Sequence, residues 1–433
     1  MDRINVRGVV IASLAGLLFG FDTAVVSGVT SALRAVYHLD DAGLGLAVSI
    51  ALWGTFLGAL VMGRLGDRLG GRDALRVVGA MYVLASLGCA LAPDMGVFVV
   101  CRFIVGLAIG GSSVLAPVYI AEIAPARTRG LLVGLFQFNI VFGILIAYLS
   151  NWLVGLFLGG DDAWRWKLGL AAAPAFVFFV LLFTIGQSAR WLAARGRLDE
   201  ADKVLRAQGV ADPAAMLAEF RRSDAGQERL SWRKHRTPIL LAMGLALFNQ
   251  FTGINAILYY LNDIFAAAGF SAVSSDTQAV AVGAANLLAT FVGMALIDRF
   301  GRRYLLVGGA IGMAAALAGV TAIMADNAGQ GLLLPLLILF ILCFAASQGA
   351  VIWVYISEIF PTPVRASGQS LGAATHWVVN AVISALFPII AAHTKALPFA
   401  VFAVATLAQA FIVGRFYPET KGVELEDMDK RLS

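Results

Sequence analysis

Residues 44–72 read LGLAVSIALWGTFLGALVMGRLGDRLGGR, a long uncharged run followed by a short basic segment. The run 44–63 can cross the hydrocarbon core of a bilayer, because a spanning helix needs about 20 apolar residues. Arginines follow this run at once, and loops rich in Lys and Arg favour the cytoplasmic side of a membrane. The stretch therefore predicts a membrane helix whose C-terminal end faces the cytoplasm.

Runs of this kind recur along the whole chain. Of its 433 residues 60% are apolar and only 14% are charged, which is too apolar for a water-soluble globule. We expect an all-α membrane protein with twelve transmembrane helices. Long apolar helices, unlike alternating ten-residue strands, exclude an outer-membrane barrel. The expected spans are near 7–32, 44–63, 74–92, 95–121, 130–156, 165–186, 237–268, 277–297, 304–324, 330–357, 366–392 and 397–417.

The net charge of +5 could indicate a nucleic-acid partner, but the basic residues follow the membrane topology instead. Most Lys and Arg fall in the segments predicted to be cytoplasmic, above all in 190–236. Four fall on the other side, namely Arg34, Arg165, Lys167 and Lys395. This asymmetry is the positive-inside rule. We expect an integral plasma (inner) membrane protein with both termini cytoplasmic, a lipid bilayer around it and no nucleic acid.

Other kinds of chemistry have little support. Cys89, Cys101 and Cys343 lie inside apolar runs without the spacing of metal ligands, so they are interpreted as packing residues. The chain has no Gly-x-x-x-x-Gly-Lys-Ser/Thr loop for ATP. We expect no metal, no cofactor and no enzymatic activity.

The chain is predicted to consist of two related halves. The longest polar stretch, 187–236, separates an N-terminal six-helix half (1–186) from a C-terminal one (237–417), and a short cytoplasmic tail follows (418–433). The stretch is predicted to be a cytoplasmic linker with short helices; a plain solvated linker is the alternative. Duplicated halves predict a pseudo-two-fold axis, a central site near the midplane and alternating access.

The evidence for duplication is a set of repeated charges at the cytoplasmic ends. Asp67-Arg68-Leu69-Gly70 recurs as Asp298-Arg299-Phe300-Gly301, and the pair Glu122 and Arg129 recurs as Glu358 and Arg365. Repeated clusters of this kind suit salt bridges that form when the cytoplasmic side is closed. The alternative is that these charges only fix the topology. The predicted gate set is Asp67, Arg68, Glu122, Arg129, Asp298, Arg299, Glu358, Arg365 and Glu419.

Several motifs in the same order resemble the sugar porter family of the major facilitator superfamily, over nearly the whole chain. They are Gly16–Gly28 in span one, Gly63–Arg72 after span two, Arg102 to Glu122 in span four, Gln250–Tyr260 in span seven and Pro418–Gly422 in the tail. The resemblance implies a major facilitator fold with two pseudo-symmetric six-helix halves, and a sugar as the small-molecule substrate.

The chain departs from the family pattern at a few positions. Gln187 stands where an acid is usual, which is expected to weaken one inner salt bridge, while Glu419 keeps its counterpart in the other half. Gly71 stands where a second Arg is common. Three further departures lie close to where family members hold sugar, namely Asn249, Ala350 and His376. The substrate, whether hexose, pentose or polyol, therefore stays open.

A monosaccharide has a ring of hydroxyls around apolar C–H faces. Its site needs amides, which donate and accept hydrogen bonds at once, and aromatic plates. Gln250 and Asn255 in span seven are about 140° apart around a helix, so both can face one cavity. The alternative is that the amides only join spans and the tryptophans fill space. Together with the resemblance, this gives the substrate-binding set Gln137, Gln250, Asn255, Asn286, Trp353, His376 and Trp377.

Asp22 and Arg102 are charges inside spans of the first half, and each costs about 2.5–3.5 kcal/mol near the bilayer centre if unpaired. Such residues pair with one another or serve transport. If Asp22 faces Arg102, the pair keeps the carboxylate charged, and separation in a drier environment favours its protonation. In the resembled family an acid at this position is typical of proton-coupled members. The alternative is a static pair that holds spans one and four together.

The residues and the resemblance together favour a proton-coupled monosaccharide symporter that functions as a monomer by alternating access, with the proton as coupling ion. A passive uniporter of the same fold is the first alternative. A transporter-like sugar sensor is the second, although such proteins usually carry a long cytoplasmic extension and few residues follow Tyr417 here.

Overall fold

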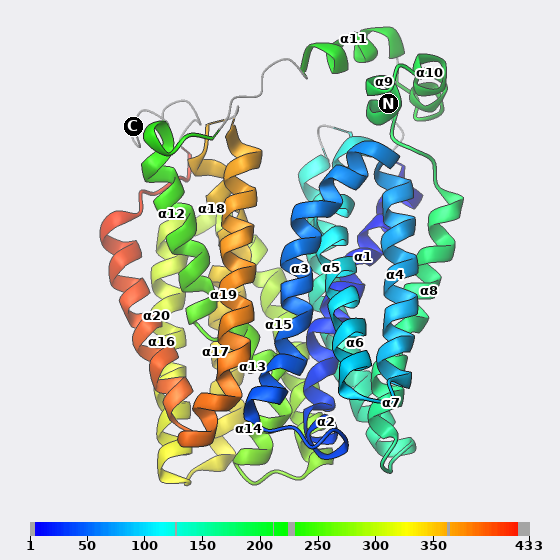
Figure 1. Cartoon of the computed structure of the whole chain (residues 1–433). Coiled ribbons are helices and arrows are strands. Elements are labelled where there is room, and N and C mark those ends of the chain that lie inside the picture. The colour runs from blue at the N-terminus through cyan, green and yellow to red at the C-terminus, as the bar shows by residue number, and fades with distance from the viewer. Residues whose placement is uncertain (1–4, 126–127, 211, 224–229, 362–363, 423–433) are drawn as a thin grey trace. The chain divides into compact units, whose positions relative to one another are not determined.

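The computed structural model describes residues 5–125, 128–210, 212–223, 230–361 and 364–422, and all the regular elements in these ranges are helices (Figure 1). Twelve spans in the described part are long and apolar enough to cross a membrane, which confirms the predicted fold class. They are α1 with η1 (Val6–Val25, Val26–Gly28), α3 (Asp41–Leu69), α4 (Gly71–Leu91), α5 (Met95–Ile123), α6 (Arg129–Phe157), α7 with α8 and η2 (Ala163–Gly169, Ala172–Leu181, Leu182–Thr184), α12 with α13 (Trp232–Phe251, Ile254–Tyr259), α15 (Ala272–Phe300), α16 (Arg302–Asp326), η3 with α17, η4 and α18 (Gln330–Leu332, Leu333–Phe344, Ala345–Gly349, Ala350–Ile359), α19 (Arg365–His393) and α20 (Leu397–Phe416).

Shorter helices fill the connections. Two lie outside the spans, α2 (Thr30–Val36) and α14 (Leu261–Ala267), and three lie in the polar middle stretch, α9 (Ala189–Ala194), α10 (Leu198–Ala207) and α11 (Pro213–Ser223). The last three share a small apolar cluster that includes Leu192 and Leu205. Short helices therefore form in the predicted linker, each too short to be stable alone in water.

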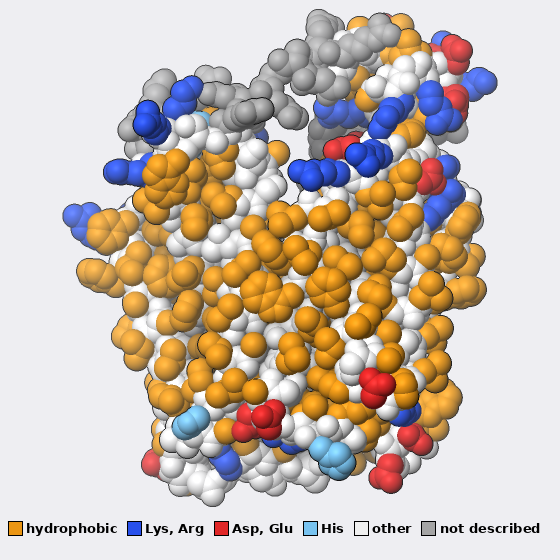
Figure 2. Space-filling model, viewed as in Figure 1, with side chains coloured by type: hydrophobic (Ala, Val, Ile, Leu, Met, Phe, Trp, Pro, Cys, Tyr) orange, Lys and Arg blue, Asp and Glu red, His pale blue; other side chains and the backbone are white. Residues whose placement is uncertain are grey.

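The side chains on the helix surfaces are those of a protein in lipid. Figure 2 shows hydrophobic side chains along the length of the helices in each part of the chain, with Lys and Arg gathered toward the ends that carry α9 to α11 and the start of α12. Leu84, Leu131 and Phe411 are large apolar residues that remain more than two-thirds exposed, at 70%, 79% and 72%. Such exposure is unfavourable in water but is expected where hydrocarbon is the solvent.

The chain divides into two compact units. The first comprises 1–22, 50–147 and 162–227, and the second comprises 23–49, 148–161 and 228–433. Three helices, α1, α3 and α6, pass from one unit into the other, so the units do not follow the predicted halves residue by residue. The predicted division at 187–236 stays a prediction.

Close helix contacts build the first unit. A Cβ atom at Gly20 on α1 would overlap the carbonyl oxygen of Ile140 on α6, and one at Gly106 on α5 would overlap the carbonyl oxygen of Ala51 on α3. Glycine is required at both positions because backbones meet there. Small residues at such crossings let membrane helices pack by van der Waals contact, since lipid supplies no hydrophobic force between them.

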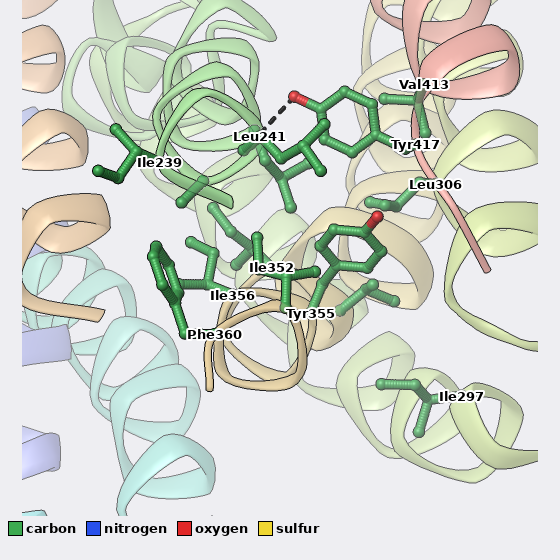
Figure 3. Close-up of a cluster of buried hydrophobic side chains, with 14 of the residues drawn as sticks. Ile239, Leu241, Ile297, Leu306, Ile352, Tyr355, Ile356, Phe360, Val413 and Tyr417 are labelled. Atoms are coloured by element: carbon green, nitrogen blue, oxygen red, sulfur yellow. Dashed lines mark hydrogen bonds between the residues drawn. The ribbon is translucent and has the colours of Figure 1, made fainter. Parts of the chain in front are cut away.

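The second unit has an apolar core near the ends of its helices that are predicted to be cytoplasmic (Figure 3). Ile352, Tyr355 and Ile356 of α18 pack with residues of α12 and α20, and they are at most 2% exposed. Tyr417, after α20, donates from its hydroxyl to the carbonyl oxygen of Leu241 on α12 at 3.0 Å. This bond ties the end of the last span to span seven.

The ends of spans one, two and five that are predicted to lie outside also belong to the second unit. The hydroxyl of Tyr148 on α6 donates to the carbonyl oxygen of Leu258 on α13 at 3.0 Å. Ser27 lies 3.4 Å from the amide oxygen of Asn262 on α14. A Cβ atom at Gly45 on α3 would overlap a carbonyl oxygen of α19. These ends therefore pack directly against spans seven and eleven.

Candidate functional site

The two charges predicted inside the first half form one buried ion pair. Arg102 on α5 donates through Nη1 to Oδ1 of Asp22 on α1 at 2.5 Å, and the two residues are 3% and 6% exposed. The Arg102 Nε atom is buried without a hydrogen-bond partner among the described residues. Tyr82 on α4, itself 2% exposed, donates to the carbonyl oxygen of Leu18 one turn before Asp22. The pair is therefore shielded from solvent, and one N–H group of the guanidinium lacks a hydrogen-bond partner among the described residues.

Span seven is broken between its two key amides. Helix α12 ends at Phe251, Gly253 takes a left-handed conformation with φ +81°, and α13 begins at Ile254. The expected spacing of Gln250 and Asn255 around one continuous helix is therefore wrong, because Gly253 breaks the helix between them. They nevertheless meet, since Asn255 Nδ2 donates to Gln250 Oε1 at 2.9 Å. Broken helices of this kind are common where transporters bind substrate.

Gln250 also forms hydrogen bonds with other buried polar side chains. Its Nε2 donates to Oδ1 of Asn249 at 3.0 Å and lies 3.1 Å from the ring nitrogens of His376 on α19. Asn249 Nδ2 donates in turn to Oε1 of Gln348 in the π-helical turn η4, at 3.3 Å. Asn249, Gln250, Gln348 and His376 are all at most 8% exposed. Four amides and an imidazole are thus connected in the second unit.

Two tryptophans lie beside this network. The centroid of the Trp353 ring on α18 is 5.3 Å from that of His376, and the Trp377 ring meets the same imidazole edge-to-face at 5.0 Å. An aromatic face next to amides suits a ligand that carries both C–H surfaces and hydroxyls. The structure therefore brings together five of the seven residues predicted to bind substrate: Gln250, Asn255, Trp353, His376 and Trp377.

Among the described residues, no hydrogen bond joins the other two predicted contacts to this network. Asn286 on α15, in the same unit, is 7% exposed, and its carbonyl oxygen accepts from the hydroxyl of Thr290 at 2.9 Å. Gln137 lies half-buried on α6 in the first unit. Their roles in sugar binding stay predictions.

At the end of the second unit that is predicted to be cytoplasmic, acids bind the start of α16. Glu358 on α18 pairs with Arg302 at 2.9 Å and also accepts from the hydroxyl of Thr420 at 2.6 Å. The Glu419 carboxylate accepts from the backbone N–H groups of Arg302 and Arg303 at 2.9 and 3.0 Å. A carboxylate at a helix N-terminus satisfies free N–H groups and suits the helix dipole.

The first unit repeats this arrangement with an amide in place of the acid. Gln187 accepts from the backbone N–H of Arg72 at the start of α4 at 3.3 Å, and it donates to Asp73 Oδ2 and to the carbonyl oxygen of Leu69, both at 2.9 Å. Ser188 donates to Glu122 at 2.5 Å, as Thr420 does to Glu358. Gln187 and Glu419 therefore occupy equivalent places in the repeat.

The remaining predicted gate residues have varied contacts. The carbonyl oxygen of Asp67 accepts from Trp191 on α9 at 3.0 Å, that of Arg68 accepts from Arg195 at 3.3 Å, and that of Arg299 accepts from Lys421 at 2.8 Å. The Glu358 carboxylate pairs with Arg302, which is not in the predicted gate set. The side chains of Arg129 and Asp298 lie outside the described residues. A gating role for the set stays a prediction.

Sequence reasoning missed Arg302 and Gln348 as site residues. Arg302 had a signal, because the offset that relates Asp67 to Asp298 also relates Gly71 to Arg302. The position where the first half lacks its usual Arg is thus filled in the second half. Gln348 had no signal, since a lone Gln in an apolar span shows neither its partner nor its burial.

One more acid lies at the end of the second unit that is predicted to face outward. Asp263 on α14 has a buried Oδ2 without a hydrogen-bond partner among the described residues. Burial raises the pKa of Asp263 to about 6, although a hydrogen bond from Thr30 and the charge of Arg34 act in the opposite direction. This carboxyl therefore titrates at mildly acidic pH.

Known proteins resemble this chain over nearly its full length. A family model described as "Sugar (and other) transporter" matches residues 8–432. The glucose transport protein of Synechocystis sp. is 35% identical, over 96% of this chain and 95% of that protein. The D-xylose-proton symporter of Escherichia coli is 33% identical, over 97% and 94%. The major myo-inositol transporter of Bacillus subtilis is 33% identical, over 98% and 93%.

Solved structures agree with these relatives. The inward-open conformation of the xylose transporter from E. coli superposes with a TM-score of 0.88 at 30% identity, covering 98% of this chain and 99% of that one. A crystal structure of D-xylose-proton symporter gives a TM-score of 0.83 at 31% identity, covering 97% and 99%. The chain is therefore a member of the sugar porter family of the major facilitator superfamily, a sugar transporter and not an enzyme.

Proposed function

We propose that the chain is a proton-coupled monosaccharide symporter that takes up a hexose or pentose by alternating access. It lies in the plasma (inner) membrane with both termini in the cytoplasm and functions as a monomer. The proton is its coupling ion, and no other cofactor takes part.

The buried pair of Asp22 and Arg102 carries the proton half of this proposal. Both charges lie in membrane spans and are at most 6% exposed, so keeping them there costs free energy unless they pair. While the pair is closed, the guanidinium of Arg102 lies 2.5 Å from Oδ1 of Asp22. If the helices that carry the two residues move apart, the carboxylate is left in a dry environment and binds a proton. A helix movement is thereby linked to proton binding.

The amide and aromatic cluster of the second unit supports the sugar half. Asn255 and Gln250 offer both donors and acceptors, which the hydroxyls of a monosaccharide require. Trp353 and Trp377 flank the imidazole of His376 and present apolar faces for C–H groups. The names of the relatives add support for this class of substrate, since they specify D-xylose, glucose and myo-inositol.

The test is transport by the purified protein in proteoliposomes. Labelled D-xylose, D-glucose and myo-inositol are offered singly, with and without an inward proton gradient. We expect one of them to accumulate above its external concentration only when the gradient is present, and to leak out when a protonophore is added. Rapid counterflow without any accumulation would instead identify a passive uniporter.

A further inference from the structure

The four amides of the second unit form a chain with one direction. Asn255 donates to Gln250 at 2.9 Å, Gln250 to Asn249 at 3.0 Å and Asn249 to Gln348 at 3.3 Å, always from amino group to carbonyl oxygen. Gln348 ends the chain. It is 0% exposed, and its Nε2 has no hydrogen-bond partner in the described part of the protein.

The direction of this chain determines what Asn255 offers to a ligand. A side-chain amide has a donor end and an acceptor end, so flipping one member alone would set two like ends against each other. The members therefore keep one direction or reverse together. In the observed direction Asn255 uses one N–H for Gln250, so it offers a ligand its free Oδ1 as acceptor and its second N–H as donor. In the reversed direction Asn255 would offer both N–H groups, while its Oδ1 would already accept from Gln250.

The imidazole of His376 is compatible with the observed direction. The amino group of Gln250 lies 3.1 Å from the ring, so a ring nitrogen accepts from it. Reversal would bring the Gln250 carbonyl oxygen to the ring, which would then have to supply an N–H group. Gln348 at the far end is held in the π-helical turn η4, directly before the helix α18 that carries Trp353. Such turns widen a helix locally and often occur at functional sites.

From this geometry we infer that Gln348 is a positioning residue, which holds the direction of the amide chain and so sets the donor and acceptor pattern that Gln250 and Asn255 present to the sugar. It acts through Asn249 and does not need to touch the substrate. The inference rests on the proposed sugar site of the second unit, and it assigns part of that site's specificity to a residue behind it.

The experiment compares Gln348→Met with Gln348→Glu. Met has a similar shape but accepts no hydrogen bond from Asn249, whereas Glu keeps a side-chain oxygen that can accept it as Gln348 does. The matched control is Gln409→Met, since Gln409 on α20 is an equally buried glutamine of the same unit, at 0% exposed. The probes are D-xylose and D-glucose, each with its monodeoxy and monofluoro analogues.

The readout is the ratio of apparent affinities for the parent sugar and for the analogue that the wild type discriminates most strongly, measured by competition in counterflow. We expect Gln348→Met to lower this ratio about fivefold, the value of one net hydrogen bond. Gln348→Glu and Gln409→Met should keep it within about twofold. A purely structural role would lower expression or turnover without changing the ratio.

Two results would overturn the inference: an unchanged ratio in a transporting Gln348→Met variant, or an equal loss in Gln348→Met and Gln348→Glu. If Gln348→Met does not fold, Asn249→Leu removes the same hydrogen bond from the other side, and an unchanged ratio there is equally decisive. Counterflow uses no proton gradient. A failure of proton coupling would therefore leave this assay intact and appear only in the accumulation experiment.

Discussion

Replacing Asp22 with Asn should separate sugar movement from proton movement. Asn has the size of Asp and its amide oxygen can still accept from Arg102, whose Nη1 lies 2.5 Å from the present carboxylate oxygen. It cannot ionise, so it imitates the protonated carboxyl in every conformation. The cluster of Gln250, Asn255 and Trp353 is left untouched, and sugar binding should survive.

The size of the effect follows from the charge that crosses with each sugar. One elementary charge is worth about 2.3 kcal/mol per 100 mV of membrane potential, which corresponds to about fifty-fold accumulation. The wild type should approach this value in proteoliposomes, and Asp22→Asn should fall to no accumulation while still exchanging sugar down a gradient. Some stability is also lost, because breaking a buried pair outright costs about 3–5 kcal/mol and Asn restores only part of it.

A matched control excludes a general effect of removing a buried carboxylate. Asp276 on α15 is 4% exposed and accepts from Asn262 at 2.5 Å. It lies near the start of α15, whereas Glu358 and Glu419 bind the start of α16, which follows the end of α15. Asp276→Asn should keep both accumulation and sugar-induced alkalinisation of the medium. The reasoning is refuted if Asp22→Asn still concentrates sugar against its gradient, or if Asp276→Asn abolishes accumulation as completely.

Three further predictions use groups outside the sugar cluster. Gln187→Glu should lower the Tm, because it removes the hydrogen bond donated to Asp73 and places a second carboxylate beside that residue. This holds even though an acid at 187 would match Glu419 in the repeat, and an equal or higher Tm would contradict it. Because the pKa of Asp263 is raised from 3.8 to about 6, its part of the free energy of unfolding, at most about 3 kcal/mol, is lost as pH rises from about 4 to about 6. That slope should be absent in thermal unfolding of Asp263→Asn, and identical slopes would exclude the effect. A cysteine replacing Ala207, exposed on α10, should react with an impermeant maleimide only in inverted vesicles, and labelling of intact cells would reverse the proposed topology.

The spans could be predicted from the sequence because each rests on a local property, a run of apolar residues. Their ends were less predictable. The span expected at 44–63 is the helix Asp41–Leu69 in the structure. A helix can continue past the bilayer as long as its backbone N–H and C=O groups are hydrogen-bonded. The break in span seven was missed for the opposite reason. A single Gly253 in an apolar run does not reveal a left-handed turn.

Long-range partners were the hardest part of the site. The repeated charges suggested salt bridges at the helix ends but did not identify the partners, and Glu358 binds Arg302, which is 56 residues away. The pair of Asp22 and Arg102 was predictable because a charge in a membrane span has few other ways to be stabilised. The role of Gln348 could not be predicted, because the direction of its side chain depends on the π-helical turn that contains it.

The repeat also determines how movement can pass between helices. Helix α3 ends at Leu69 and α4 begins at Gly71, while α15 ends at Phe300 and α16 begins at Arg302, so a single glycine with φ of +85° or +89° forms each link. One residue spans at most about 3.6 Å. Neither helix of such a pair can slide along its axis without pulling the other. The two helices of each pair are therefore expected to move together along their axes.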